Sequence, residues 1–405
     1  MNKNKIIILG GHGENDSING LMRGYIPLFE ARGFEVFNYN LSDQSWNRQQ
    51  LIEVLQSKEV LFALTYLGFG QNISIVTEEN GNPKNIWEFF NVPLLKWQGD
   101  IAAYLLERHI AIPRNAVNLY PYEEWFYYWK NWIVPTDYSL TRIIQPFPLY
   151  SIPLSTVNRK QRLQGKLVFH KTGGNPDSII EKCKQQLPNS IFSLFKNMCE
   201  ILISKEYVQK PSISVGDLIS TFLVNQGISA RISPKLFHFL AAQLDSYSRC
   251  VKLTLVVNSL LDFPIVIHGR GWEYIDFSNT KAQNLPPINY EESTDIFLNQ
   301  FGVIDISPNT SDSPHDRIWR AAGSYNLCIT NKQAWIDKFV GFENLMYEFN
   351  KESIQETVSN ILKNPEESQE MAIAFGERFR LVWTEQKAVD QLIEIAELVS
   401  FNFSY

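Results

Sequence analysis

Short apolar runs that end in glycine or in polar residues alternate with stretches of helical spacing through the first third of the chain. The runs are KIIILGG (5–11), FEVFNYNL (34–41), VLFALTYLGFG (60–70), a run that ends at Asp100, and AVNLY (116–120). This alternation favours parallel sheets, because parallel neighbours need a long return connection that a helix usually supplies. The expected fold class is therefore α/β.

The same order returns in the second part of the chain. Its apolar runs are KLVFHKTGGNP (166–176), FPIVIHG (263–269), FGVIDIS (301–307) and a final YNLCITN (325–331). A long helical stretch separates the first two, from about residue 176 to 261. Three helices follow the last run, predicted over 352–364, 368–383 and 384–401.

The length of 405 residues predicts two domains, since single cores stop growing near ~250 to 300 residues. The expected organisation is a Rossmann-like lobe over 1–150, a proline-containing connector over 151–165, a second lobe over 166–385, and a C-terminal helix over 386–405 that packs back toward the first lobe. Ligands of such sheets bind beyond the carboxyl ends of the strands. We therefore expect two Rossmann-like lobes facing across a cleft that holds the site.

Composition excludes some partners. The formal charge of -6 offers no basic field for nucleic acid, and no apolar run reaches the ~20 residues of a membrane span. The start of the chain also lacks the apolar core of a signal peptide, so we expect a cytoplasmic protein that binds no nucleic acid. Its four cysteines show no CxxC spacing and are expected to be buried free thiols.

Aromatic residues are concentrated in one segment. Eight of the thirteen residues from Tyr120 to Trp132 are aromatic. One interpretation is a helix packed into a domain interface. The other is the stacking wall of a binding cleft, for a sugar face or an acceptor.

In each lobe, one glycine turn follows the first strand. In LGGHGEND (9–16) the glycines expose backbone N–H groups that suit an anion, but the spacing is not the GxGxxG of a dinucleotide site. His12 in this turn is either a plain turn residue or a base facing the cleft. In FHKTGGNP (169–176), Lys171 beside Gly173 would suit a diphosphate, although the Walker pattern is absent. A surface lysine is the alternative.

A third glycine turn, in IVIHGRGWE (265–273), places Gly269 and Gly271 at the end of another strand. Backbone without side chains would admit a base or a ribose there.

The segment DISPNTSDSPHDRIWRAAGS (305–324) is the strongest candidate site. A buried strand empties into a turn rich in hydroxyls and N–H groups, and a helix then begins whose N-terminal dipole favours negative charge. Its polar residues, namely Ser307, Asn309, Ser313, His315, Asp316 and Arg317, could together receive a diphosphate. The alternative is a solvated helix cap with an internal ion pair.

Other chemistries find little support. The six histidines are scattered without the spacing of a metal site, so we expect no metal and no cofactor. A GxSxG elbow for a serine hydrolase is absent as well.

The order of four features resembles a known family. The first is Arg249 followed by an apolar helix. The others are VIHGRGW, NYEESTDIFLNQFGVIDISPNTSDSPHDRIWRAAGSYNLCITN and FVGFENLMYEFNKESIQETVSNILKNPEESQEMAIAFGERF. Together they are similar to the CgeB-like (spore-protein YkvP/CgeB) glycosyltransferases, which belong to the group-one family with the two-lobed GT-B fold. The resemblance covers the last 160 residues well and the first 150 only in outline.

The resemblance implies transfer of a sugar, of hexosyltransferase type, from a nucleoside-diphosphate sugar without a bound metal. The C-terminal lobe would bind the donor, with a UDP-sugar expected first, and the N-terminal lobe would bind an acceptor glycan, protein or small molecule. Gly269 and Gly271 would lie beside the nucleotide. Lys171, with Ser307, Asn309, His315 and Arg317, would lie beside the phosphates and the sugar.

Two positions depart from the family pattern. Arg320 stands near the place where relatives commonly carry a glutamate, and Tyr325 stands where they often have glycine. Both departures bear on the identity of the donor. If the transfer inverts the anomeric centre, His12 or Asp100 is expected to act as the base. A nucleotide-sugar epimerase and a non-catalytic sugar-binding or partner-binding protein are the competing interpretations.

Overall fold

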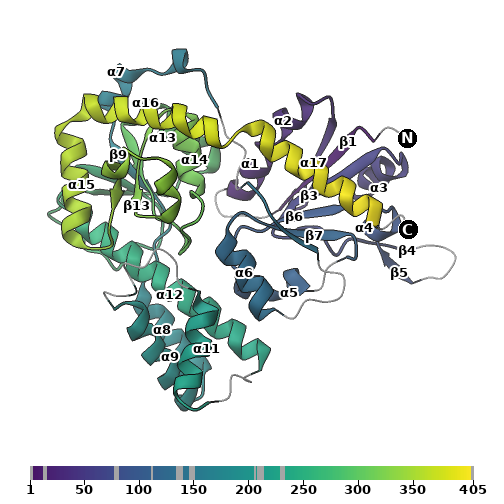
Figure 1. The fold of residues 1–405 in the computed structure, drawn as a ribbon, viewed down its shortest axis with the longest axis horizontal. Helices are drawn as coiled ribbons and strands as arrows, with labels where there is room; N and C mark the ends of the chain where they lie inside the picture. Colours follow the sequence, from purple (N-terminus) through teal and green to yellow (C-terminus); the bar gives the residue numbers. More distant parts are fainter. Residues whose placement is uncertain are drawn as a thin grey trace. The chain divides into compact units, whose positions relative to one another are not determined.

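The computed structural model describes residues 3–11, 16–76, 82–110, 113–133, 140–145, 151–204, 207, 214–228 and 233–402. The chain forms two compact units. The first comprises Met1–Pro148 together with Trp383–Tyr405, and the second comprises Leu149–Val382 (Figure 1). The predicted catalytic residue His12 lies outside the described residues.

The first unit is a parallel sheet with helices. Its elements are β1 (Lys5–Gly10), α1 (Ser17–Arg23), α2 (Ile26–Glu30), β2 (Glu35–Asn40), α3 (Arg48–Gln56), β3 (Val60–Tyr66), β4 (Ser74–Val76), β5 (Pro83–Asn85), α4 (Ile86–Phe89), β6 (Leu94–Trp97), η2 (Ala102–Leu105), α5 (Leu106–Ile110), β7 (Ala116–Tyr120), α6 (Glu123–Trp132), β8 (Leu140–Ile143) and α17 (Glu385–Asn402). The main sheet has the order β2-β1-β3-β6-β7-β8, and all of its pairs are parallel. β4 and β5 form a separate antiparallel pair.

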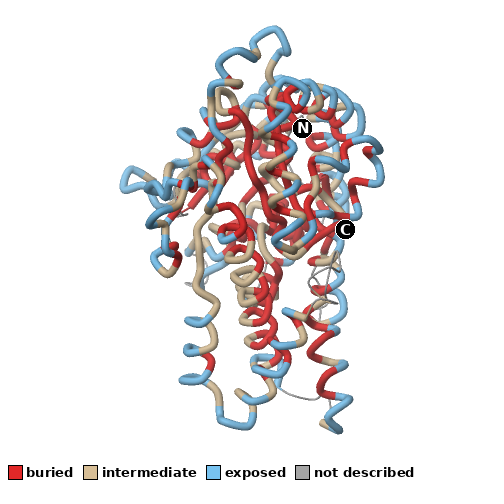
Figure 2. Tube along the Cα trace, turned by 90° about the vertical axis from the view of Figure 1, so that its left-hand side faces the viewer, coloured by how far each residue is buried: buried red, intermediate tan, exposed pale blue. Residues whose placement is uncertain are grey.

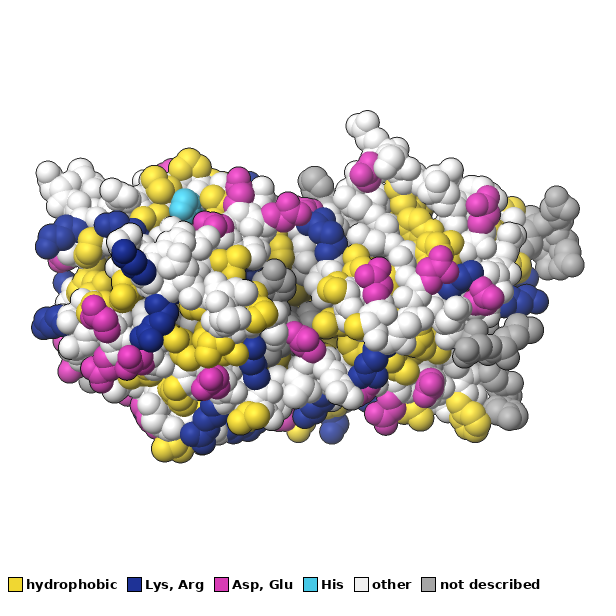
Figure 3. Space-filling model, turned by 90° about the horizontal axis from the view of Figure 1, so that it is seen from above, with side chains coloured by type: hydrophobic (Ala, Val, Ile, Leu, Met, Phe, Trp, Pro, Cys, Tyr) yellow, Lys and Arg dark blue, Asp and Glu magenta, His cyan; other side chains and the backbone are white. Residues whose placement is uncertain are grey.

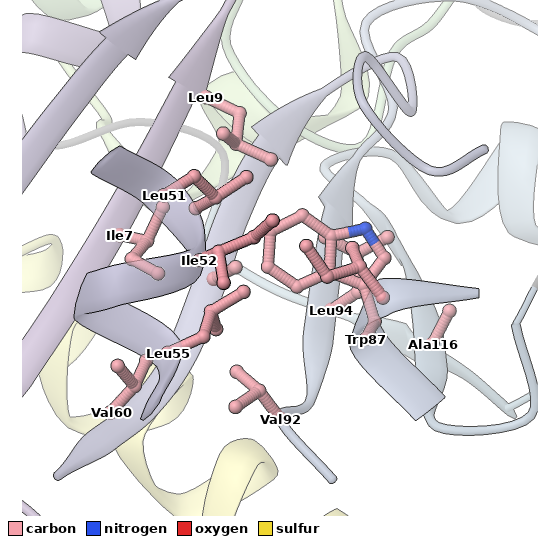
Figure 4. Packing of buried hydrophobic residues seen from close by; sticks show 12 residues of the cluster. Ile7, Leu9, Leu51, Ile52, Leu55, Val60, Trp87, Val92, Leu94 and Ala116 are labelled. Atoms are coloured by element: carbon pink, nitrogen blue, oxygen red, sulfur yellow. The ribbon is translucent and has the colours of Figure 1, made fainter. Parts of the chain in front are cut away.

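The core of this unit lies against the central strands. β1, β3, β6 and β7 are nearly continuous runs of buried residues, as expected where helices cover both faces of a parallel sheet. Figure 4 shows one part of this core, where Leu51 and Leu55 of α3 point toward Ile7 and Leu9 of β1 and toward Trp87. The buried side chains of α3 thus belong to one apolar cluster with residues of β1, β3 and α4.

The second unit repeats the design. Its elements are η3 (Leu154–Thr156), α7 (Arg159–Gln164), β9 (Leu167–His170), α8 (Pro176–Gln186), α9 (Asn189–Leu202), α11 (Val215–Asn225), α12 (Pro234–Leu260), β10 (Ile265–His268), β11 (Gln283–Leu285), α13 (Tyr290–Asn299), β12 (Gly302–Ile304), α14 (Asp316–Gly323), β13 (Leu327–Asn331), η4 (Ala334–Lys338), η5 (Glu343–Leu345), β14 (Met346–Tyr347), α15 (Lys351–Lys363) and α16 (Pro365–Val382). The strand order is β11-β10-β9-β12-β13-β14, and every pair is again parallel. The predicted α/β class with two Rossmann-like sheets is confirmed.

The connection from β9 to β10 is long, and in its described residues the regular elements are helices. α8, α9 and α11 pack against α12, and in Figure 1 this group extends away from the strands of its own unit. α12 begins with a Ser233 cap and Pro234 in its first turn, which is a common start for a helix. Figure 2 shows buried and exposed positions alternating along these helices. The C-terminal part of α12 also contacts α15, where Gln355 Nε2 donates to the Ser259 carbonyl. Because α15 packs on β14, this contact connects the helical group to the rest of the unit.

Two predicted boundaries differ from the structure. The run 325–331, expected to be the last strand, is followed by β14, which pairs with β13. The segment 151–165, expected as a connector, contains η3 and α7 and is grouped with the second unit. The side chain of Arg162 in α7 is fully buried.

Cysteine chemistry fits the expectation of free thiols. All four cysteines are unpaired: Cys183, Cys199 and Cys328 are buried, and Cys250 is partly exposed.

Candidate functional site

Neighbouring parallel strands bring two of the predicted segments to one edge of the second sheet. β12 pairs with β9 in parallel, so both strands end on the same side. β9 leads into Lys171, and β12 leads through Asp305 and the loop of residues 307–315 to the start of α14. In open α/β sheets, ligands bind at the edge where the parallel strands have their carboxyl ends.

His315, the residue before α14, is held between two carboxylates. Its Nδ1 lies 2.8 Å from Asp305 Oδ1 and its Nε2 lies 2.9 Å from Asp316 Oδ1. Burial alone would disfavour a charged imidazole, but Asp316 and Asp305 outweigh it and raise the pKa of His315. Because a carboxylate oxygen lies beside each nitrogen, the charged imidazolium, which can donate from both nitrogens, is the favoured form.

Asp305 anchors this cluster, although the sequence did not single it out among the candidate site residues. Its side chain is 0% exposed, and its Oδ2 accepts from the Thr330 hydroxyl at 3.3 Å. Burial by itself would raise the pKa of this carboxyl, yet His315 and Arg317 lower it. The Tyr347 hydroxyl donates to the Asp305 carbonyl at 2.7 Å. The one sequence signal was an acidic residue inside the apolar run FGVIDIS.

Arg317 lies in the first turn of α14 with one side of its guanidinium fixed. Nε donates to the His170 carbonyl at 3.0 Å, and Nη1 lies 3.4 Å from Asp305 Oδ1 and 3.6 Å from Asp316 Oδ1. In the part of the chain that the structure describes, no acceptor is bonded to Nη2. This amino group can donate to a bound anion.

Lys171 adds a second cation beside Arg317. Burial, followed by the charge of Arg317, lowers the pKa of the Lys171 ammonium to about 8. The same two causes, in the same order, lower the pKa of His170 to about 3, so that imidazole is neutral. α14 contributes a third positive feature, because His315 makes no side-chain cap bond to its first turn and the helix dipole is positive there.

The glycine turns of this edge interlock with each other. Gly173 N donates to the Arg270 carbonyl at 2.8 Å, and a Cβ at Gly271 would approach the Gly173 carbonyl oxygen to 2.7 Å. A Cβ at Gly269 would collide with the Lys171 carbonyl, and Gly271 has a φ of +79°. These glycines let two loops pack closely, whereas their contact with a nucleotide stays a prediction.

The remaining predicted residues lie in the 307–315 loop. Ser307 is bonded to Asn331 through its backbone N–H at 2.8 Å and its hydroxyl at 3.1 Å. The side-chain amide of Asn309 is engaged by α12, and Ser313 is partly buried two residues before His315. Ser307, Asn309, Ser313 and His315 thus all lie in this one loop. The internal ion pair that the alternative interpretation, a solvated helix cap, expected is also present, between His315 and its two aspartates.

The two departures from the family pattern have separate structural roles. Arg320 points to α13, where its guanidinium donates to Ser293 Oγ at 2.9 Å and Thr294 Oγ1 at 3.0 Å and lies 4.3 Å from the Tyr290 ring centroid. Tyr325 follows α14 with a φ of +56°. That conformation is common for glycine after a helix.

Asp100, the predicted base, belongs to the first unit. It is partly buried and lies three residues beyond β6. The surrounding edge is polar: Gln98 Nε2 donates to Asn118 Oδ1 at 2.8 Å, and the buried Lys96 ammonium donates to the Arg108 carbonyl. Burial and Arg108 lower the pKa of Lys96 well below its ordinary value. Asp100 and His12 stay predictions for the catalytic base.

The described residues contain no group of three or more His, Cys, Asp and Glu side chains that could hold a metal ion. They also contain no helix that is long and apolar enough to cross a membrane.

No family model matches the sequence, and no curated protein matches it, so the CgeB-like resemblance stays a prediction. Solved structures do match over nearly the whole chain. An α-glucosyltransferase in complex with UDP-glucose and DNA containing an abasic site is 11% identical, with a TM-score of 0.50. T4 phage BGT in complex with UDP and Mn²⁺ is 9% identical, with a TM-score of 0.52.

A third match is the DNA modifying enzyme β-glucosyltransferase, at 8% identity and a TM-score of 0.52. For each of the three, the match covers 97% of this chain and 99% of the other. At these identities the likeness concerns architecture. The protein has the two-unit GT-B fold of these glucosyltransferases.

Proposed function

We propose that this protein is a glycosyltransferase that takes a sugar from a nucleoside-diphosphate sugar, with a UDP-sugar as the first candidate. The observation that carries the proposal is the convergence of the α14 N-terminus, Arg317 and Lys171 at the carboxyl edge of the second sheet. Cations and unpaired backbone N–H groups together suit a diphosphate. The GT-B fold shared with UDP-bound glucosyltransferases adds support.

The chemistry asked of this edge is electrostatic. When the bond between the anomeric carbon and the diphosphate oxygen breaks, the electron pair stays on the leaving diphosphate, whose negative charge grows. Donors that are already fixed stabilise that charge without reorganising. Arg317 is held by His170 and Asp305, so its Nη2 would meet the phosphates in a preset orientation.

We further propose that the transfer needs no resident metal, with Arg317, Lys171 and the imidazolium of His315 facing the leaving group. T4 phage BGT was solved with Mn²⁺, which makes this point worth testing. Turnover is expected to survive EDTA and to change less than twofold when Mn²⁺ is restored. Loss of turnover in EDTA with recovery in Mn²⁺ would contradict it.

The first unit is proposed to bind the acceptor, with Asp100 as the base that takes its proton and His12 as the second candidate. Asp100→Asn is expected to lower turnover at least a hundredfold while the Kd of UDP changes less than threefold. Unchanged turnover would remove Asp100 from the mechanism, and the same pair of measurements on His12→Ala tests the other candidate.

The acceptor class is open to direct test. One solved neighbour contains DNA, but this chain carries a net charge of -6, and on the face drawn in Figure 3 acidic and basic side chains are interspersed. DNA binding usually draws on a broad basic surface. We therefore propose a glycan, protein or small-molecule acceptor, and DNA is the control substrate.

A thermal-shift panel tests the donor proposal, because a ligand that binds only the folded state raises the melting temperature. The panel comprises UDP, GDP, dTDP, CMP and ADP, each with its nucleoside. We expect at least one diphosphate, UDP first, to raise the melting temperature where its nucleoside raises it less. A flat response to all five would refute the donor site.

A further inference from the structure

Helix α12 contacts the 307–315 loop through charged side chains. Lys252 Nζ of α12 donates to Asn309 Oδ1 at 2.8 Å. Asn309 Nδ2 in turn donates to Asp245 Oδ1 at 2.9 Å and to the Asp245 carbonyl at 3.3 Å. The amide of Asn309 is therefore gripped at both its oxygen and its nitrogen.

The two residues that bind the Asn309 amide lie on one face of α12, together with Arg249. Asp245, Arg249 and Lys252 are spaced i, i+4 and i+7, which places them above one another on a helix. Arg249 Nε lies 2.8 Å from Asp245 Oδ2, which orients that carboxylate. Asp245 and Lys252 are both buried, and Asn309 has a φ of +56°. The side-chain bonds thus hold a left-handed backbone conformation that residues other than glycine adopt less often.

The same helix also contacts the loop that carries Lys171. The Thr254 hydroxyl lies 2.8 Å from the Tyr274 hydroxyl, which donates to the Gly174 carbonyl at 3.0 Å. A Cβ at Gly174 would come within 2.6 Å of Cys250 Sγ. α12 therefore contacts both the turn after β9 and the loop before α14, from which the two cations of the candidate site extend.

We propose that Asp245 and Lys252 are positioning residues for the donor site. They fix Asn309, and through it the 307–315 loop, so that His315 and Arg317 stand at the right distance from Lys171 for a diphosphate. Neither residue contacts the donor. The inference rests on the proposed function and assigns Asn309, expected from sequence to lie beside the donor, a role in holding the loop.

An exchange of the amide and the carboxylate tests this arrangement. Asn309→Asp sets a carboxylate against Asp245, and we expect it to weaken UDP binding at least tenfold while uridine binding changes less than twofold. Adding Asp245→Asn puts an amide opposite that carboxylate, so the pair again consists of one amide and one carboxylate with an unchanged total charge. Lys252 can still donate to the side chain at position 309. The double variant is expected to bind UDP within threefold of wild type.

A second variant covers the case in which Asn309→Asp does not fold. Asn309→Gly keeps access to the positive φ and removes the side-chain hydrogen bonds to Asp245 and Lys252. It is expected to weaken UDP binding three- to tenfold with uridine binding unchanged. A role in stability alone would lower the melting temperature of these variants and leave the UDP affinity of the folded protein intact.

Isothermal titration with UDP and uridine separates the possible failures. If wild type binds no nucleoside diphosphate, the proposed function fails. If wild type binds UDP and Asn309→Asp or Asn309→Gly binds it equally well, or if the exchange restores nothing, the positioning role is wrong while the donor site stands.

Discussion

Lys171 is the residue whose charge should respond most to a ligand. Its pKa is lowered to about 8 by burial and then by Arg317, so near that pH the side chain is a mixture of the charged and neutral forms. A bound diphosphate stabilises the charged form and raises this pKa. UDP binding near pH 8 should therefore take up protons, and the affinity should fall as the pH rises through the pKa of the free protein.

Titration calorimetry in buffers of different ionisation enthalpy measures that uptake. Lys171→Arg is the matched control, because arginine stays charged and the ionisation of UDP itself is common to both proteins. The uptake at pH 8 should be lost in Lys171→Arg. Equal uptake in both proteins would show that Lys171 does not face the phosphates.

Residues of the candidate site differ in how far the sequence could reveal them. His315, Arg317 and Lys171 stand in polar turns after apolar strands, and the structure brings them to one sheet edge. Asp245 and Lys252 lie on a helix about sixty residues before Asn309 in the sequence. An amphipathic pattern there indicates which face of the helix is buried, but not which residues it packs against. That pairing arises from tertiary packing alone.

At the scale of elements, α7 joins the ends of two other helices. The buried guanidinium of Arg162 donates to the Leu298 and Phe297 carbonyls at the end of α13 and to the Ser324 and Tyr325 carbonyls after α14. These are groups that a helix end leaves without partners. A proline-rich sequence gave no sign of this role.

Arg162→Met should therefore destabilise the second unit strongly. The Leu298, Ser324 and Tyr325 carbonyls would lose this donor, whereas the Phe297 carbonyl still accepts from Asn326 Nδ2. Each unsatisfied buried group costs roughly 1 to 3 kcal/mol, so we expect a loss of about 3 kcal/mol or more in urea unfolding. Arg159→Ala on the same helix breaks only an exposed ion pair with Glu370 and should cost less than about 0.5 kcal/mol. Similar costs for the two variants would contradict the capping role.

The end of α14 allows a test of the Tyr325 departure. Its positive φ costs roughly 1 to 2 kcal/mol, but the ring is buried and Arg380 lies 3.9 Å from its centroid. Ring burial contributes roughly 1.5 to 3 kcal/mol and the cation contact adds to it. Tyr325→Gly should therefore destabilise the protein, by about 1 kcal/mol or more.

Lys58 provides the control for that substitution. It follows α3 with a φ of +60°, but its side chain is exposed. Lys58→Gly should be neutral or stabilising by up to about 1 kcal/mol, as measured by urea unfolding. If both glycine variants were stabilised, the ring contacts of Tyr325 would contribute little.

The elements that the sequence did not predict share a physical cause. β8 has only one buried residue, all of β11 is exposed, and β14 has two residues. Each lies at the edge of its sheet, where a strand needs no apolar run. The central strands were predictable because helices on both faces of the sheet require them to be apolar.

At the scale of the whole molecule, the division of the chain predicts how function separates. The candidate donor residues all lie within Leu149–Val382, which is one continuous compact unit. The first unit is discontinuous, because α17 returns to pack on α2 and β3. We expect the fragment 149–382 to fold alone, as judged by circular dichroism, and to bind UDP within tenfold of the full chain.

Truncation from the other side supplies the comparison. A chain ending at Val382 removes α17 and uncovers the surface that it buries, so the first unit should unfold at lower urea than in the full chain while UDP binding persists. A folded fragment 149–382 that does not bind UDP would show that donor binding needs residues outside it.

The central claim is that the start of α14 binds a diphosphate, and one calorimetric comparison tests it most directly. Arg317→Ala removes the guanidinium at the sheet edge, and Arg320→Ala removes one on the same helix that is bonded to α13. We predict that Arg317→Ala weakens UDP binding at least thirtyfold and uridine binding less than threefold, while Arg320→Ala changes the UDP affinity less than threefold. Equal losses of UDP and uridine affinity in Arg317→Ala, or equal UDP affinities in the two variants, would contradict the claim.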